Sequence, residues 1–147
     1  MNAGFVLMLS TNVPPDPIRE EVPALLAQFK ECGVTYVLTT KNISAKGYTQ
    51  GVSRVALIVN GSRKLVAHGV FQAVHDYRTN TLRGPKLYHH LRPPTAKLWV
   101  ELSEFVAVNP PQDIAVLGWF KPGDRTPLTS ETIPKGQGGQ YFKVCHP

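Results

Sequence analysis

Polar side chains gather where a predicted strand ends, in the first third of the chain. The sequence VTYVLTT over 34–40 has the period of two that is typical of a strand. A cation, a carboxamide and a hydroxyl follow at once, on Lys41, Asn42 and Ser44. Tyr48 comes next in the same short loop, among polar neighbours, where a place in the core is less natural for it. This combination favours a pocket that grips a flat ligand such as a nucleic-acid base.

A basic stretch over 77–97 is the second candidate site. It carries five cations and no acid: Arg78, Arg83, Lys86, Arg92 and Lys97. Tyr77 and Tyr88 stand between these cations. Lysine and arginine contact phosphates, and aromatic rings stack on bases. The stretch therefore fits a nucleic-acid contact, and a solvated loop that is basic by chance is the equal alternative.

The other aromatic and imidazole side chains favour simpler interpretations. Trp99 stands between two apolar residues of a predicted strand, which suits packing on the second face of a sheet, although it is also a candidate for stacking a base. Four histidines could be taken for a metal cluster: His68, His75, His89 and His90. Adjacent histidines rarely share one ion, and no carboxylate or thiol stands at ligand spacing. We expect no metal site and no cofactor.

Motifs of common catalytic sites are absent from the sequence. It contains no GxSxG elbow, no P-loop and no HExxH. The glycines of 136–139 do not stand between a strand and a helix, so they are not a dinucleotide fingerprint. We therefore expect a protein that is not an enzyme.

Length and composition indicate one soluble globular domain over residues 1–147, with 42% hydrophobic residues. The net charge of +6 favours a polyanionic partner. Cys32 and Cys145 share no CxxC spacing, which argues against a disulfide framework and a cysteine zinc site. Neither a membrane span nor a secretory signal is recognisable. These features predict an intracellular protein, either cytoplasmic or nuclear.

The pattern of elements predicts an α+β fold. Strands are expected over 5–10, 34–40, 55–59, 64–74, 97–108 and 141–144, and 114–120 is a short helix or a strand. One main helix should follow Asp16 as N-cap and stop at Gly33, with Pro23 causing a late start or a kink. Asn109 and the two prolines after it should end the fifth strand. Strands without intervening helices predict a small curved or barrel-like mixed sheet, with one main helix and short peripheral ones.

The order of these motifs resembles the YTH domain of the PUA-like superfold, and its EVE branch, over about 34–142. The features that carry the resemblance are Lys41 and Asn42 after a strand, Tyr48 in the next loop, and VALIVNGSRKLVAHGVFQAV over 55–74. The segment PKGQGGQ over 134–140 is similar to the place where YTH domains put a basic residue near the nucleotide backbone. A YTH cage begins with tryptophan, where this chain has tyrosine.

The resemblance implies a reader that flips a modified base, such as methyladenine or methylcytosine, into an aromatic cage. Asn42 and Ser44 would touch the base edge, and Tyr48 would form one wall. The second wall would come from Tyr77, Tyr88 or Trp99. Phosphate contacts would come from Lys41, Lys46, Arg83, Lys86 and Lys135. The polymer, RNA or DNA, is left open.

Two other functions and a larger assembly remain open. An ASCH-like enzyme acting on a modified nucleoside would need a lysine and a carboxylate in one pocket. Lys41 or Lys46 could supply the lysine, but no acid follows before Asp76. A protein-binding adaptor is the other alternative. Relatives attached to restriction systems suggest a reader module with a fused or associated nuclease or NTPase.

Overall fold

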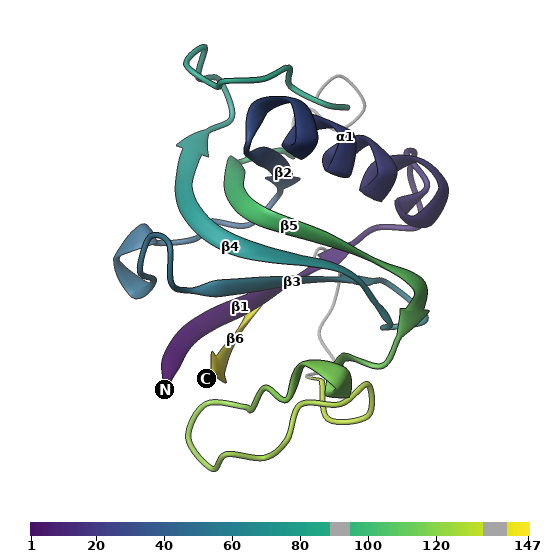
Figure 1. The fold of residues 1–147 in the computed structure, drawn as a ribbon, viewed down its shortest axis with the longest axis vertical. Helices are drawn as coiled ribbons and strands as arrows, with labels where there is room; N and C mark the ends of the chain where they lie inside the picture. Colours follow the sequence, from purple (N-terminus) through teal and green to yellow (C-terminus); the bar gives the residue numbers. More distant parts are fainter. Residues whose placement is uncertain (89–94, 134–140) are drawn as a thin grey trace.

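The computed structural model describes residues 1–88, 95–133 and 141–147, in which six strands form one sheet (Figure 1). The strands are β1 (Asn2–Leu9), β2 (Thr35–Thr39), β3 (Arg54–Val59), β4 (Leu65–Asp76), β5 (Leu98–Gln112) and β6 (Tyr141–His146). Their order is β2-β5-β4-β3-β1-β6, and β1 pairs with β3 in parallel while the other neighbours are antiparallel. The predicted α+β class, with a mixed sheet and one main helix, is confirmed.

The sheet is open, so the barrel that the sequence suggested is not observed. Within the described residues β2 and β6 are the two edge strands, and no pairing joins them. The long strands β4 and β5 bend strongly in Figure 1. Three register shifts interrupt their pairing, and such bulges increase local bend and twist. The sheet therefore curves without closing on itself.

The helix forms where its caps predict. The Asp16 carboxylate accepts hydrogen bonds from the backbone N–H groups of Ile18 and Arg19 at 2.9 and 2.8 Å. A single wide turn, η1 (Pro17–Glu21), precedes α1 (Val22–Cys32). Pro23 is thus in the first turn of α1, where its missing N–H costs no helical bond, so the late start is confirmed. Gly33 ends α1 in the left-handed conformation, with φ of +78°.

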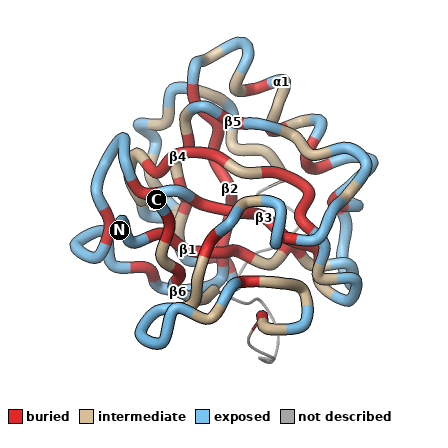
Figure 2. The backbone as a smooth tube through the Cα atoms, turned by 60° about the horizontal axis from the view of Figure 1, so that its bottom comes forward, coloured by how far each residue is buried: buried red, intermediate tan, exposed pale blue. Residues whose placement is uncertain are grey.

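Apolar side chains cover both faces of the sheet. On one face, called the helix face here, α1 packs Val22 and Leu25 into a cluster that contains Phe5 of β1. On the other, the far face, Val6 of β1 packs against the 113–133 segment, which begins with the short helix η4 (Ile114–Leu117). Figure 2 shows the buried strands between exposed loops. Consecutive residues of β1 and of β3 are buried, and neighbouring residues of a strand point to opposite faces. These two strands are therefore covered on both sides.

The fifth strand is longer than predicted. β5 continues through Pro110 and Pro111 to Gln112, which pairs with Leu65. The prediction that these prolines end the strand is wrong. The reason is that β2 pairs only as far as Leu102, which leaves the rest of β5 at an edge. A proline is tolerated at an edge because its missing N–H need not face another strand.

Candidate nucleic-acid interface

Tyr48 lies in the core of the helix face. It is 9% exposed, and its ring centroid is 4.6 Å from that of Phe5 and 5.8 Å from that of Phe71. Its hydroxyl forms a hydrogen bond with the hydroxyl of Tyr141. Burial is the main cause that raises the pKa of Tyr48, and the bond to Tyr141 adds to it. The expectation that Tyr48 avoids the core is wrong, because its ring gains apolar contacts while its hydroxyl keeps a partner.

The polar residues before Tyr48 remain on the surface of the same loop. Lys41, Asn42, Ser44 and Lys46 are exposed, whereas Ile43 between them is buried in the core of the helix face. The short helix η2 (Ala45–Gly47) joins Ile43 to Tyr48. Two buried side chains therefore anchor a loop that presents two cations, an amide and a hydroxyl to solvent.

Trp99 is also a core residue, so the prediction that it packs on the second face of the sheet is confirmed. It is fully buried, and its Nε1 donates a hydrogen bond to the Tyr77 carbonyl at 3.1 Å. The half-buried ring of Tyr77 stacks on it, with centroids 6.4 Å apart. Val100 packs on the helix face, so Trp99 points to the far face. The sheet thus separates Trp99 and Tyr77 from Tyr48, and these rings do not form one cage.

Tyr88 lies beside η1, away from both Tyr48 and Trp99. Its hydroxyl donates to the Glu20 carbonyl at 3.4 Å, which sets the ring near η1. Desolvation, followed by the nearby charge of Glu20, raises the pKa of Tyr88. Tyr77 and Tyr88, the two half-buried tyrosines among the candidates, thus contact different elements.

The basic segment 77–88 is fixed to the rest of the molecule by the buried side chain of Gln28. Its Nε2 donates to the Pro85 carbonyl at 2.7 Å, and its Oε1 accepts from Tyr36 N–H at 3.1 Å and from Thr35 Oγ1 at 2.9 Å. A Cβ on Gly84 would lie 2.8 Å from that same Nε2, so the backbone approaches α1 closely. The segment is therefore held in place against α1 and β2, while Arg78 and Arg83 remain exposed to solvent.

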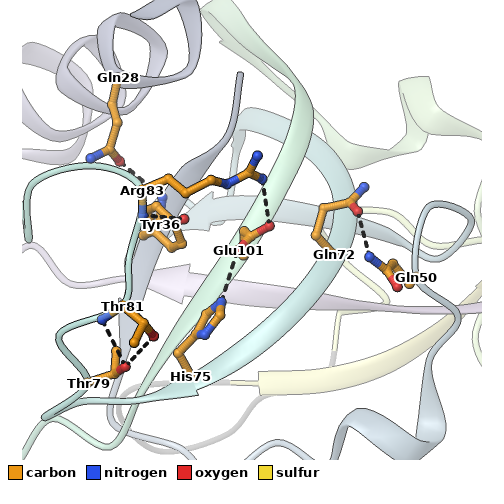
Figure 3. Close-up of polar contacts among 9 residues, drawn as sticks. All are labelled: Gln28, Tyr36, Gln50, Gln72, His75, Thr79, Thr81, Arg83 and Glu101. Atoms are coloured by element: carbon orange, nitrogen blue, oxygen red, sulfur yellow. Dashed lines mark hydrogen bonds and ion pairs between the residues drawn. The ribbon is translucent and has the colours of Figure 1, made fainter. Parts of the chain in front are cut away.

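Arg83 is paired on the far face of the sheet with a carboxylate that the sequence did not single out. Its backbone N–H donates to the Tyr36 hydroxyl at 3.1 Å, and its guanidinium lies 3.3 Å from Glu101 Oε2. The other oxygen of Glu101 is 2.9 Å from His75 Nε2 (Figure 3). The side chain of Glu101 is only 12% exposed, against 62% for Arg83. Because side chains alternate between the faces of a strand, Trp99 and Glu101 of 98–103 share one face. This alternation was the sequence signal that could have identified Glu101.

More polar side chains continue along this face. Gln72 Nε2 donates to Ser103 Oγ at 2.7 Å. Gln50 Nε2 donates to Gln72 Oε1 at 3.4 Å (Figure 3). Val70 pairs with Ser103 on one side and with Arg54 on the other, so these three residues stand side by side across β5, β4 and β3. We call the resulting row the polar strip; its members are Arg83, Glu101, His75, Gln72, Ser103, Arg54 and His68.

A pocket opens at the Arg54 end of the polar strip. Its volume is about 320 Å³, and it is lined by Arg54, His68, Val116, Leu117, Trp119 and Pro147. Behind Arg54 the ring of His146 is buried, with its centroid 5.5 Å from that of Trp119. The backbone N–H of Arg54 donates to His146 Nε2 at 3.0 Å. Trp119 is a core residue of the far face, with 3% of its surface exposed.

Three earlier candidates lie outside the described residues. These are Lys135, the proposed phosphate contact in the tail, the histidine pair at 89–90, and Arg92 of the basic stretch. Within residues 1–88, 95–133 and 141–147, no group of three or more His, Cys, Asp or Glu side chains could hold a metal ion.

Comparison with known proteins gives no relative. No family model, no curated protein and no solved structure matches the chain. The helices in the described part of the chain are all too short or too polar to cross a membrane.

Proposed function

We propose that the chain is a nucleic-acid-binding module of the PUA-like superfold, and that it recognises a modified, methylated base in RNA or DNA. The observation that carries the proposal is the separation of charge along the chain. Residues 33–75 carry five cations and no acid, and 77–100 carry five more and no acid. Residues 16–31, in contrast, carry four of the ten acids. A polyanion is attracted by the first two stretches and repelled by the third.

The fold keeps the first basic stretch apart from the acids, whereas the second contacts α1 and η1 through Pro85 and Tyr88. Lys41 and Lys46 lie on the loop that contains η2, and the acids Asp16 and Glu20 lie at η1. Figure 1 shows η2 and η1 at opposite sides of the molecule. Arg83 belongs to the anchored segment 77–88 and lies beside Glu101, at the end of the polar strip away from Arg54. A strand of nucleic acid would therefore approach from the side away from η1.

Base recognition is assigned to the exposed polar residues rather than to an assembled cage. Asn42 and Ser44 are exposed next to the cations, and amide and hydroxyl groups can read the edge of a base. Tyr77 is the candidate for stacking on this approach, because Tyr88 lies against η1. Tyr48 and Trp99 support the core. The bent mixed sheet with one main helix supports a PUA-like fold.

The proposal is tested by fluorescence anisotropy with labelled oligonucleotides. Unmodified, methyladenine and methylcytosine versions are compared as RNA, single-stranded DNA and duplex DNA, between 50 and 200 mM salt. We expect affinity to fall with salt, with a slope of about −0.7 per phosphate contact for single strands. Lys41→Ala should weaken all oligonucleotides, and Asn42→Ala should reduce the preference for the modified base. Lys30→Ala, an exposed cation of α1, is the control and should bind as the wild type does.

Each part of the proposal has its own contrary result. Equal affinity for modified and unmodified oligonucleotides would refute modified-base recognition, while salt-independent or absent binding would refute nucleic-acid binding altogether. The ASCH-like alternative requires a lysine beside a carboxylate. Within the described residues neither Lys41 nor Lys46 forms such an ion pair, and the carboxylate of Glu101 is shared by Arg83 and His75.

A further inference from the structure

The pocket between β3, β4 and η4 has the features of a preformed ligand site. We propose that it binds a single nucleotide, with the base against Val116 and Leu117 beside the edge of Trp119 and the phosphate at Arg54. This inference rests on the proposed function only in taking the ligand to be a nucleotide. The volume of the pocket, about 320 Å³, is within the range of small-molecule sites, which is roughly 300–1,000 Å³.

The apolar part of the pocket suits a flat ring. Trp119 lines it, and within the described residues nothing accepts a hydrogen bond from its indole Nε1. Leu117 and the 58%-exposed Val116 add an apolar side next to it. Bases pack on such surfaces whatever their sequence, because every base has an aromatic face.

The polar part of the pocket suits a phosphate and a base edge. The guanidinium of the exposed Arg54 forms no ion pair with any described carboxylate, and none of the lining side chains is acidic. Arginine binds phosphate through paired hydrogen bonds. Burial, with a smaller contribution from Arg54, lowers the pKa of His68. A neutral imidazole offers one donor and one acceptor to a base edge.

The walls are held in place by backbone contacts. Phe120 and Cys145 exchange two hydrogen bonds of 2.9 and 2.8 Å, which fasten the segment carrying Trp119 to β6. The backbone N–H of Arg54 donates to His146 Nε2, which fixes the Arg54 backbone at the pocket. A Cβ on Gly4 would lie 2.4 Å from the Arg54 carbonyl oxygen and 2.9 Å from His146 Cδ2. Only glycine at this position allows β1, Arg54 and His146 to meet so closely.

The test uses the intrinsic fluorescence of the full chain. Trp99 and Trp119 are its two tryptophans, and the fully buried Trp99 lies outside the pocket. AMP, GMP, CMP and UMP are titrated against the wild type, with adenosine as the ligand without phosphate. We expect saturable quenching by at least one nucleotide, and affinity at least tenfold weaker for the matching nucleoside.

Variants separate the phosphate contact from general effects. Arg54→Ala should weaken the nucleotide about as much as removing its phosphate does, and should leave nucleoside binding unchanged. Lys64→Ala, another exposed cation near the start of β4, should bind as the wild type does. Val116→Glu places an acid at an exposed rim position and should abolish nucleotide binding without unfolding the chain. Nucleotide binding that survives both Arg54→Ala and Val116→Glu would overturn the inference.

Parallel anisotropy with oligonucleotides distinguishes this inference from the proposed function. Oligonucleotide binding without quenching by any mononucleotide overturns the inference and leaves the proposed function standing. Nucleotide binding that depends on Arg54, without oligonucleotide binding, supports the pocket and refutes the proposed function. Absence of both refutes both.

Discussion

The buried amide of Gln28 donates a hydrogen bond from Nε2 to the carbonyl of Pro85, 2.7 Å away and 57 residues later in the chain. One side chain of α1 thereby fixes the basic segment, and through its Oε1 it also holds the start of β2. Arg83 is placed by the same residues, because its backbone N–H donates to the hydroxyl of Tyr36, whose own N–H donates to Gln28. The placement of this segment and its cations thus depends on a residue of α1, which follows the acidic turn η1.

Replacement of Gln28 by alanine should destabilise the fold and loosen the segment 77–88. The change leaves several buried polar groups without a partner, and we expect the free energy of unfolding to fall by about 2–3 kcal/mol. Urea unfolding measures this loss, and hydrogen exchange should increase at the amides of 83–88. Gln50→Ala, at an exposed glutamine, should change stability by less than about 0.5 kcal/mol. Unchanged exchange in Gln28→Ala would contradict the anchoring role.

Truncation of Tyr48 should affect stability before it affects recognition. Tyr48→Ala removes a buried ring that packs on Phe5 and Phe71, and should cost about 3–5 kcal/mol. Tyr48→Phe keeps the ring but leaves the Tyr141 hydroxyl without its partner, and should cost about 1–2 kcal/mol. Thermal and urea unfolding measure both. If Tyr48→Ala kept full stability but lost selectivity for a modified base, the ring would belong to the site and not to the core.

Removal of the Glu101 charge should strengthen nucleic-acid binding. The carboxylate neutralises part of the field of Arg83, 3.3 Å away, and Glu101→Gln releases that cation toward a phosphate. We expect affinity for oligonucleotides to rise about two- to fivefold at low salt, and the gain to shrink as salt increases. Because Arg83 is largely exposed, losing the pair should cost stability by no more than about 1 kcal/mol. Arg83→Gln should act in the opposite direction, and equal effects from both variants would contradict the assignment.

The neutral form of His146 should make stability depend on pH. Its Nε2 accepts from Arg54 N–H, which leaves Nδ1 to donate to the Pro147 carbonyl at 2.8 Å. A second proton on Nε2 would face a donor. Burial, chiefly, and the charge of Arg54 lower the pKa of His146 from its usual 6.5. Below pH about 6.5 the unfolded chain therefore binds more protons than the folded one, and the free energy of unfolding falls as pH falls.

This pH dependence can be assigned with one variant. His146→Gln cannot take up the proton, so the difference in stability between wild type and variant should narrow from pH 8 to pH 5. Urea midpoints at each pH measure the difference, and its sign at pH 8 should favour the wild type. A constant difference across this range would show that His146 is not the titrating group.

Local features of the sequence were sufficient to predict most of the elements. Asp16 and Gly33 mark the ends of the helical region because each contributes a local backbone conformation and hydrogen bond that needs no distant partner. The turn at Asn60 and Gly61, which joins β3 and β4, is also local. Gly61 has φ of +92°, a conformation that glycine adopts without a distant partner. Alternation, or in β1 and β3 a short continuous apolar run, similarly identified all six strands, with errors only at their ends.

Only the tertiary structure decided which side chains meet. Tyr48 stands among polar residues along the chain, yet its ring is buried because the loop that carries it folds over Phe5 and Phe71, which belong to other strands. Glu101, His75 and Arg83 converge because β4 and β5 pair in one particular register. The sequence by itself determined period, caps and charge distribution, which depend on neighbouring residues. The order of strands, the face on which each loop packs and the pocket at Arg54 depend on contacts between distant residues, and these form only in the folded chain.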